Sequence, residues 1–243
     1  MADHIWHDDN NDIMKLYSII SHHDFYEPLP TLCPVCGKKS GHIYIHRYDD
    51  VRGGSWVWCS SCHCYTHASY RVPDWWRNPS KFTILDLHAI PDNLDDHADY
   101  IDDFVNKLLA IHDDKELRAS RSTSTPCEKC GTLMERIIPE GLGGTLGEVC
   151  PNCGWGAVTS YFDPIVTDQT KYQITLLAGN NTSIEIIRAV NQVSHRNLLR
   201  SRELILSAPQ IIFEGRALEV HDKKKILDQA NVLYNIEPDY LYE

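Results

Sequence analysis

The chain has 243 residues, of which 42% are hydrophobic and 23% charged, and its formal net charge is −11 at pH 7. This length allows two or three small domains, and the acidity disfavours a general nucleic-acid binder while it suits a basic partner. The sequence has no apolar run of about 18 residues. Its first twelve residues are polar and acidic, unlike a signal peptide. We therefore expect a cytoplasmic protein that does not cross a membrane.

One short helix is predicted ahead of the cysteines. Apolar residues recur at helical spacing over residues 12–20, where Ile13, Leu16 and Ile20 share one face. Because a small metal-bound unit buries little surface by itself, we expect this helix to pack on it. The Ser-His-His-Asp stretch at residues 21–24 could bind a metal, although a solvated turn is the simpler interpretation.

Nine cysteines in a reducing compartment favour metal binding over disulfides. Eight of them form pairs separated by two residues: Cys33/Cys36, Cys59/Cys62, Cys127/Cys130 and Cys150/Cys153. This spacing places both sulfurs on one side of a tight turn, and two such turns complete a tetrahedron around Zn2+. We therefore predict two structural Zn2+ ions, each enclosed by four thiolates and neither open for catalysis.

The first four cysteines frame a predicted zinc ribbon. Residues 41–48 and 55–59 have strand character, and the turn-rich residues 49–54 join them. Glycine follows the second cysteine in three of the four pairs, at Gly37, Gly131 and Gly154. There the backbone needs a positive φ so that its amides can point at the thiolates.

The ligands of the first ribbon leave alternatives open. Cys64 has no partner in the pairing, and His63 and His67 are near enough in sequence to replace a cysteine. Cys64 itself is expected to be a small, partly buried residue, with a redox or nucleophilic role as the alternative.

An acidic helix is predicted within residues 90–114, starting at Pro91 and Asp92. One stripe of the helix is apolar: Leu94, Ala98, Ile101, Val105, Leu108 and Leu109. The other face is acidic: Asp95, Asp96, Asp99, Asp102 and Asp103. A solvated face is one interpretation, and a docking surface for a cationic partner is the other.

Residues 118–126 are polar and predict a linker, after which the last four cysteines predict a second ribbon. The glycine-rich residues 141–148 lack the Lys-Ser/Thr of a phosphate loop, so we interpret them as the hairpin turn of this ribbon. We divide the chain into residues 1–117 (helix, first ribbon, acidic helix), 118–165 (second ribbon) and 166–243. We find no catalytic constellation in the sequence and predict that the protein is not an enzyme.

The C-terminal residues predict a β-α-α-β-α-β order. The expected strands are residues 172–177, 210–215 and 234–238, and the expected helices are residues 183–193, 196–209 and 217–233. This order gives a compact sheet with helices on one face. The overall class is therefore α+β, with two zinc ribbons and a helical extension before this small domain.

This segment resembles the C-terminal domain of the bacterial ribosomal stalk protein, through "LLAGNN", "EIIRAV", "LLRSRELILSAP" and "IIFEG" followed by a lysine-rich helix. In that family the first two helices recruit translation GTPases through lysines and a glycine-rich helix start. Here Thr182 and Ser183 stand where a lysine is expected, whereas Arg188 keeps one basic position. The resemblance implies the fold, and no catalytic residues come with it.

The first 110 residues resemble a zinc-ribbon family of bacterial polymorphic-toxin loci, through "CPVCGKKSGHIYIHRYDDVRGGSWVWCSSCH" and "VPDWW". In such loci small acidic proteins act as immunity factors. The resemblance implies a protein that occludes the active site of a cognate toxin domain acting on translation or nucleic acid. The expected contacts are Asp95, Asp99, Asp102, Asp103, Trp56, Trp58, Trp75 and Trp76. Core packing is the alternative for the tryptophans, of which we expect at least two to be buried.

Two other functions fit the sequence. A protein associated with the ribosome or a translation factor would bind through the stalk-like domain, with four contacts: Arg188, Arg196, Arg200 and Arg202. A nucleic-acid-binding ribbon would use tryptophans to stack on bases, together with six basic residues: Lys38, Lys39, Arg47, Arg52, Arg71 and Arg77. The acidic flanks disfavour nucleic acid, so we rank the immunity function first and nucleic-acid binding last.

Overall fold

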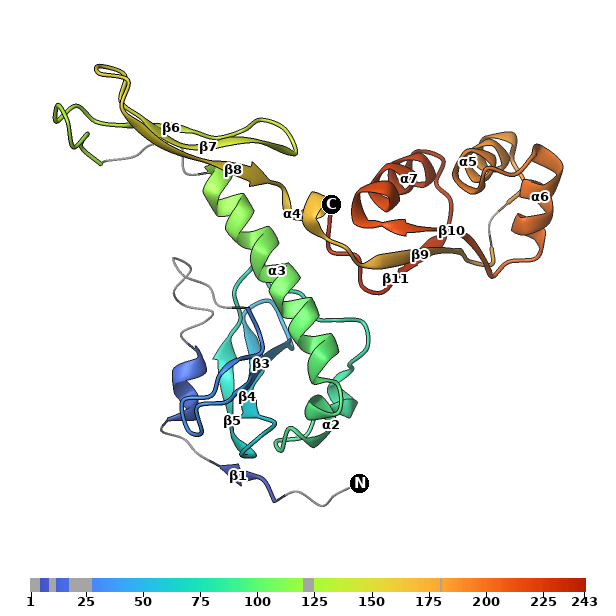
Figure 1. Cartoon of the computed structure of the whole chain (residues 1–243). Coiled ribbons are helices and arrows are strands. Elements are labelled where there is room, and N and C mark those ends of the chain that lie inside the picture. The colour runs from blue at the N-terminus through green and yellow to red at the C-terminus, as the bar shows by residue number, and fades with distance from the viewer. Residues whose placement is uncertain (1–4, 9–11, 18–27, 120–124, 180) are drawn as a thin grey trace. The chain divides into compact units, whose positions relative to one another are not determined.

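The computed structural model describes residues 5–8, 12–17, 28–119, 125–179 and 181–243 (Figure 1). The chain divides into two compact units, Met1–Asp113 and Asp114–Glu243. Each unit contains both helices and strands, which confirms the α+β class. In the described part of the chain, no helix is long and apolar enough to cross a membrane.

A five-stranded sheet, in the order β1-β5-β4-β3-β2, organises the first unit. Its strands are β1 (His7–Asp8), β2 (Thr31–Leu32), β3 (Lys39–Arg47), β4 (Arg52–Cys59) and β5 (Cys64–Arg71). Antiparallel pairing joins β3 to β4 and β4 to β5. The sequence predicted β3 and β4 but not β5, because β5 is largely polar and buries only Thr66 fully.

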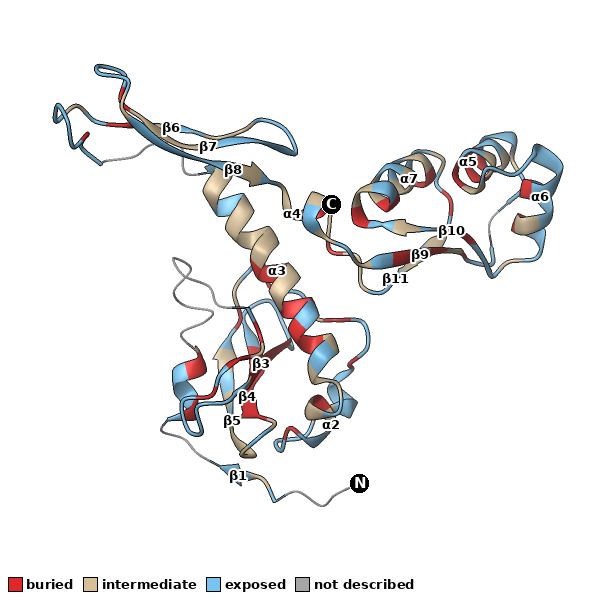
Figure 2. Cartoon of the chain, viewed as in Figure 1, coloured by how far each residue is buried: buried red, intermediate tan, exposed pale blue. Residues whose placement is uncertain are grey.

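Strands β3 and β4 are buried on both faces of this sheet (Figure 2). The 3-10 helix η1 (Ile13–Tyr17) covers one face, where Tyr17 Oη lies 2.7 Å from Ser55 Oγ. Ile13 and Leu16 of η1 are buried, as predicted for a helix that packs on the ribbon. The rest of that predicted helix, residues 18–20, and the stretch 21–24 lie outside the described residues.

The opposite face of the sheet is covered by α2 (Asp92–Asp95) and α3 (Ala98–Ala119), which replace the single predicted helix. Pro91 is the N-cap of α2, which agrees with the predicted start. The buried apolar residues of α3 are Ile101, Phe104, Val105, Leu108 and Leu109, close to the predicted stripe. α3 continues through Ala119 into the predicted linker, of which residues 120–124 are outside the described part.

The second ribbon is a three-stranded antiparallel sheet of β6 (Glu135–Ile137), β7 (Gly143–Val149) and β8 (Gly156–Phe162). Its hydrophobic cluster consists of Cys127, Met134 and Cys150, with Trp155 packed beside them. The prediction of a turn at residues 141–148 is wrong for most of that run. Gly143 to Glu148 pair with β8 as strand β7, and the bend lies before them.

The C-terminal domain has the predicted β-α-α-β-α-β order. Its elements are β9 (Lys171–Leu176), α5 (Ile184–Ser194), α6 (Leu198–Leu206), β10 (Gln210–Arg216), α7 (Ala217–Gln229) and β11 (Tyr234–Glu237), preceded by the short α4 (Pro164–Thr167). The strand order is β10-β9-β11.

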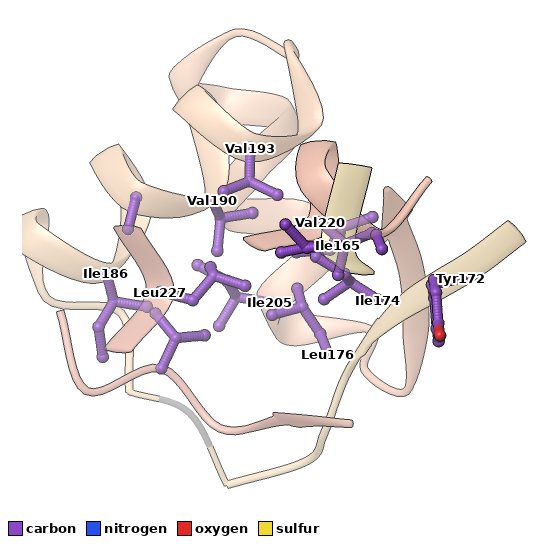
Figure 3. Close-up of a cluster of buried hydrophobic side chains, with 14 residues drawn as sticks. Ile165, Tyr172, Ile174, Leu176, Ile186, Val190, Val193, Ile205, Val220 and Leu227 are labelled. Carbon is purple, nitrogen blue, oxygen red and sulfur yellow. The ribbon is translucent and has the colours of Figure 1, made fainter. Parts of the chain in front are cut away.

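Helices α5, α6 and α7 pack against one face of this sheet (Figure 1). Alternate residues of β9, namely Tyr172, Ile174 and Leu176, are fully buried beneath them together with Val190 and Val193 of α5 (Figure 3). This period-two pattern is the one from which the strand was predicted. Both α5 and α6 begin at polar caps, whose side chains accept hydrogen bonds from backbone N–H groups of the first turn.

Candidate metal centres

The eight paired cysteines form two clusters, Cys33/Cys36/Cys59/Cys62 and Cys127/Cys130/Cys150/Cys153. Within each cluster the four Sγ atoms lie within 4.8 Å of one another. All nine cysteines are free thiols rather than disulfides. The grouping of the cysteines agrees with that predicted from their spacing.

The sulfur–sulfur distances suit a tetrahedral ion. In the first cluster, Cys33 Sγ lies 3.8 Å from Cys62 Sγ, and Cys36 Sγ lies 3.7 Å from Cys59 Sγ. The corresponding distances in the second cluster are 3.6 Å and 3.4 Å. A Zn–S bond of about 2.3 Å places neighbouring sulfurs of a tetrahedron about 3.8 Å apart, whereas a disulfide measures about 2.05 Å. Both clusters could therefore hold a metal ion with four thiolate ligands.

All four cysteine pairs are built on the same backbone turn. The N–H of the residue after the second cysteine donates to the carbonyl of the first cysteine, at 2.8 Å for Gly37 and Gly131 and 2.9 Å for Gly154 and His63. These four residues have φ angles of 71°, 74°, 72° and 55°, so the predicted positive φ is confirmed. A Cβ added to any of the three glycines would meet no atom within 4 Å, so backbone conformation alone favours glycine there.

One thiol in each cluster is set to ionise near neutral pH. Burial raises the pKa of Cys59, but hydrogen bonds from the Ser40 hydroxyl, 3.1 Å away, and from nearby backbone N–H groups outweigh it and lower the pKa to about 7. The hydroxyl and the backbone N–H of Thr132 lower the pKa of Cys130 to about 6. Thiolates are the form that binds metal, so each cluster has a ligand ready to bind at neutral pH.

His63, Cys64 and His67 lie outside the first group of four thiols. The imidazole of His67 stacks on Trp56, with ring centroids 4.5 Å apart, and burial lowers the pKa of His67. Cys64 begins β5 and is half-buried, as expected for a small structural residue.

Three of the four tryptophans expected as partner contacts belong to the core. Trp56, Trp58 and Trp76 are 2%, 0% and 2% exposed, so the expectation of at least two buried indoles is confirmed. Each indole N–H is satisfied internally, for example by the carbonyls of His88 and Ile45. The three offer no surface to a partner. Trp75 is partly exposed and stacks on His112 at 4.2 Å.

The acidic residues expected as contacts divide into two groups. Asp99 and Asp103 are exposed. Asp102 is 3% exposed and turns into the first unit, and Asp95 accepts a hydrogen bond from Trp58 Nε1 at 2.9 Å. The solvated-face interpretation is therefore wrong for Asp102 and Asp95, and the expected docking role cannot include a buried carboxylate.

A buried hydrogen-bond chain links these carboxylates to the first metal-binding turn. His42 Nδ1 lies 2.9 Å from the Asp102 carboxylate, and its Nε2 lies 2.8 Å from Ser60 Oγ. Ser60 Oγ in turn donates to the Asp95 carboxylate. Burial raises the pKa of Asp102, and the hydrogen bond from His42 opposes this effect. Because Ser60 lies between Cys59 and Cys62, the chain fastens α2 and α3 to the first cluster.

The order Asp102–His42–Ser60 resembles a nucleophile with its base, but two contacts give it a structural role. The Ser60 hydroxyl is already held by Asp95, and its backbone N–H donates to the Ser40 carbonyl at 3.1 Å. The neighbouring backbone N–H groups of the turn point at Cys59 rather than at a substrate site. The sequence prediction missed this chain, although His42 directly precedes the apolar residues Ile43, Tyr44 and Ile45 of β3.

No family model matches the chain. Among curated proteins, Large ribosomal subunit protein bL12 of Pseudomonas putida (strain GB-1) is 30% identical over 67 residues, which cover 27% of this chain and 55% of bL12. The bL12 of Ectopseudomonas mendocina (strain ymp) is 32% identical over 66 residues, covering 27% of this chain and 54% of bL12. The chain spans about half the length of the curated relatives it matches. The similarity is to the C-terminal region of bL12, and it confirms that part of the predicted resemblance.

Proposed function

We propose that the chain is a zinc-stabilised immunity protein, which binds a cognate toxin domain in the cytoplasm and occludes its active site. The observation that supports it most directly is an exposed acidic row on α2 and α3. The row consists of Asp92, Asp96, Asp99 and Asp103, spaced four, three and four residues apart. Within α3 the four-residue spacing places Asp99 and Asp103 on one side of the helix, while Asp92 and Asp96 lie at the two ends of the separate helix α2.

The charge of this row is only partly neutralised inside the protein. Lys107 Nζ lies 2.8 Å from the Asp103 carboxylate. Neither Asp96 nor Asp99 forms an ion pair with any residue that the structure describes. A toxin that acts on nucleic acid or on the ribosome needs a basic cleft, and an acidic row would meet such a cleft rapidly through electrostatic steering.

The buried contacts beneath the row support a preformed surface. Asp95 and Asp102 alternate with the exposed carboxylates and are bonded to Trp58 and His42 of the sheet. The helices are therefore held in one rotational setting with the row outward. A rigid surface loses less conformational entropy on binding, which favours affinity.

The test is co-expression with a candidate toxin domain, sought among the genes beside the one for this chain, combined with binding kinetics of the purified pair. The double variant Asp96→Asn/Asp99→Asn should lower the association rate about tenfold at low salt and reduce protection. The matched control is Glu128→Gln/Glu140→Gln, which removes two exposed charges from the second ribbon. Cells that die despite wild-type protein, or equal association rates for both double variants, would count against the proposal.

A second candidate is a translation-associated protein that binds through its stalk-like domain. It is supported by the similarity to bL12 and by an exposed surface on α5 and α6. On these helices Leu198, Leu199 and Leu206 are 47%, 74% and 67% exposed. Four exposed arginines flank them: Arg188, Arg196, Arg200 and Arg202.

Co-sedimentation with ribosomes and with translation GTPases tests the second candidate. Leu199→Ala/Arg196→Ala should abolish the interaction, because both side chains belong to the exposed surface proposed as the contact. Both are exposed and serve no packing role, so the fold should be kept. The acidic-row variant Asp96→Asn/Asp99→Asn should leave it unchanged. Absence of wild-type protein from the ribosome and GTPase fractions would remove this candidate.

A further inference from the structure

The first unit has a cavity of about 610 Å3 at the end of its sheet that is remote from the cysteines. The β3–β4 turn and the last residues of β5 form it. Its lining residues are Tyr48, Asp49, Val51, Arg52, Gly53, Ser69, Tyr70 and Arg71. Cavities of this size commonly hold small organic ligands.

The cavity has an excess of positive charge. Arg52 and Arg71 are direct cross-strand neighbours, so their guanidinium groups share one face of the sheet. Asp49 pairs with Arg52 at 2.9 Å and also accepts hydrogen bonds from the backbone N–H groups of Val51 and Arg52. Arg71 forms no ion pair within the described residues.

This arrangement favours an added anion. Like charges directly opposite each other destabilise a pair of strands, and Asp49 neutralises only one of the two arginines. The hydrogen bonds from the turn hold the pKa of Asp49 at about 2, so its carboxylate is already committed to the turn. An external carboxylate or phosphate would receive the guanidinium of Arg71 in a two-pronged hydrogen bond.

The rest of the lining offers aromatic and apolar surface. Tyr48 and Val51 are 48% and 51% exposed. The ring of Tyr70 is nearly parallel to that of Tyr17, with centroids 5.8 Å apart, and Tyr17 is itself bonded to Ser55. Tyr70 therefore lies on the face of β5 that η1 covers, opposite its neighbour Arg71, whereas Tyr48 reaches over Gly54 on the Arg71 face.

Gly54 contributes the depth of the cavity, although it does not line it directly. A Cβ on Gly54 would come within 2.4 Å of Tyr48 Oη and 2.8 Å of Trp56. Only glycine therefore lets the Tyr48 side chain lie across β4 at this point.

We propose that this cavity binds a planar ring carrying one anionic group, with Arg71 binding the anion and Tyr48 contacting the ring. A nucleoside monophosphate and an aromatic carboxylate share this chemistry. The site is distinct from the acidic row of the proposed immunity function and does not depend on it.

The test uses the full-length, zinc-loaded chain at low salt, titrated with uridine monophosphate, uridine, phenylacetate and inorganic phosphate. Calorimetry gives the affinities, and the ring signals of Tyr48 in NMR spectra locate the site. If uridine monophosphate binds and phenylacetate does not, the anionic group of the ligand is a phosphate. If only phenylacetate binds, it is a carboxylate. Binding of both supports the shared chemistry.

Arg71→Gln should weaken binding of the anionic ligands about tenfold or more, since it removes a charged hydrogen bond. Lys171→Gln, which removes an exposed cation at the start of β9, is the control and should bind as wild type does. Retention of zinc by both variants checks that they fold. Absence of binding by either ring-bearing anion, equal affinity for inorganic phosphate, or unchanged affinity of Arg71→Gln would each overturn the proposal.

Discussion

The carboxylate of Asp102 lies 2.9 Å from Nδ1 of His42, and the two residues are 3% and 4% exposed. They join α3 to β3 across 60 residues of sequence. A buried pair of this kind specifies the position of a helix more than it adds net stability, because both groups lose water on burial. Removing one partner, however, leaves the other polar group without its hydrogen bond.

Asp102→Ala should therefore destabilise the first unit by about 3–5 kcal/mol, measured from the midpoint of urea unfolding. Asp103→Ala is the matched control, because it removes the neighbouring exposed carboxylate and should change stability by about 0.5 kcal/mol or less. The double variant His42→Phe/Asp102→Leu should recover much of the loss. Equal effects of the two single substitutions would show that the buried pair has no special role.

Loss of metal should follow pH. The pKa values of Cys59 and Cys130 are lowered, and those of Cys62 and Cys153 are raised, so protons compete with metal for the thiolates of both clusters as the pH falls. Acidification should thus release the ion of each cluster. A chromogenic chelator would record both release midpoints.

Thr132→Val offers a direct check on this pH dependence. It removes the hydroxyl that lowers the Cys130 pKa most, so the release midpoint of the second cluster should move to higher pH. Ser40→Ala should do the same for the first cluster, through Cys59. Release midpoints that neither substitution moves would contradict the assignment.

Cys150→Ser should remove one of two bound ions and unfold the second ribbon. Structural Zn2+ contributes about 10–16 kcal/mol in small thiolate domains, more than this ribbon can replace with its small hydrophobic cluster. The C-terminal domain has its own core and should keep its NMR spectrum. Cys64→Ser, the control, should still bind two ions. Full metal content in Cys150→Ser would mean that Cys150 is not a ligand.

The turns themselves can be tested at Gly131 and His63, which occupy equivalent positions with φ of 74° and 55°. Gly131→Ala should weaken its cluster by about 1–2 kcal/mol, because a Cβ is strained in this conformation. His63→Gly should leave metal affinity in the first cluster unchanged or raise it slightly. Metal competition against a calibrated chelator measures both, and a Gly131→Ala protein with wild-type affinity would refute the backbone explanation.

The metal-binding turns and the C-terminal domain could be predicted because their signals are local. A two-residue cysteine spacing, a glycine after it and apolar alternation as in β9 each specify a backbone shape within a few residues. The third ribbon strand, β5, could not be found this way, because its residues are mostly polar and its pairing with β4 is a long-range contact.

The acidic helix shows where sequence patterns stop being informative. Asp95, Asp99, Asp102 and Asp103 are the same residue type within nine positions, yet two are bonded to the sheet and two are exposed. What separates them is the rotation of the helix on the sheet, and this depends on distant partners such as His42. The sequence likewise left open whether each tryptophan is buried or exposed, because the burial depends on how the strands pair.

The sparse packing of the second ribbon should affect how fast the protein is degraded in a cell. With three buried side chains and one partly buried indole, that segment has little besides the metal ion that its four cysteines could hold to protect it from proteases. The supply of zinc would then determine how long this segment resists proteolysis. In zinc-starved cells, proteases should cleave the protein first between residues 125 and 162. If the chains remain intact after a chelator is added to a growing culture, the ribbon persists without its ion.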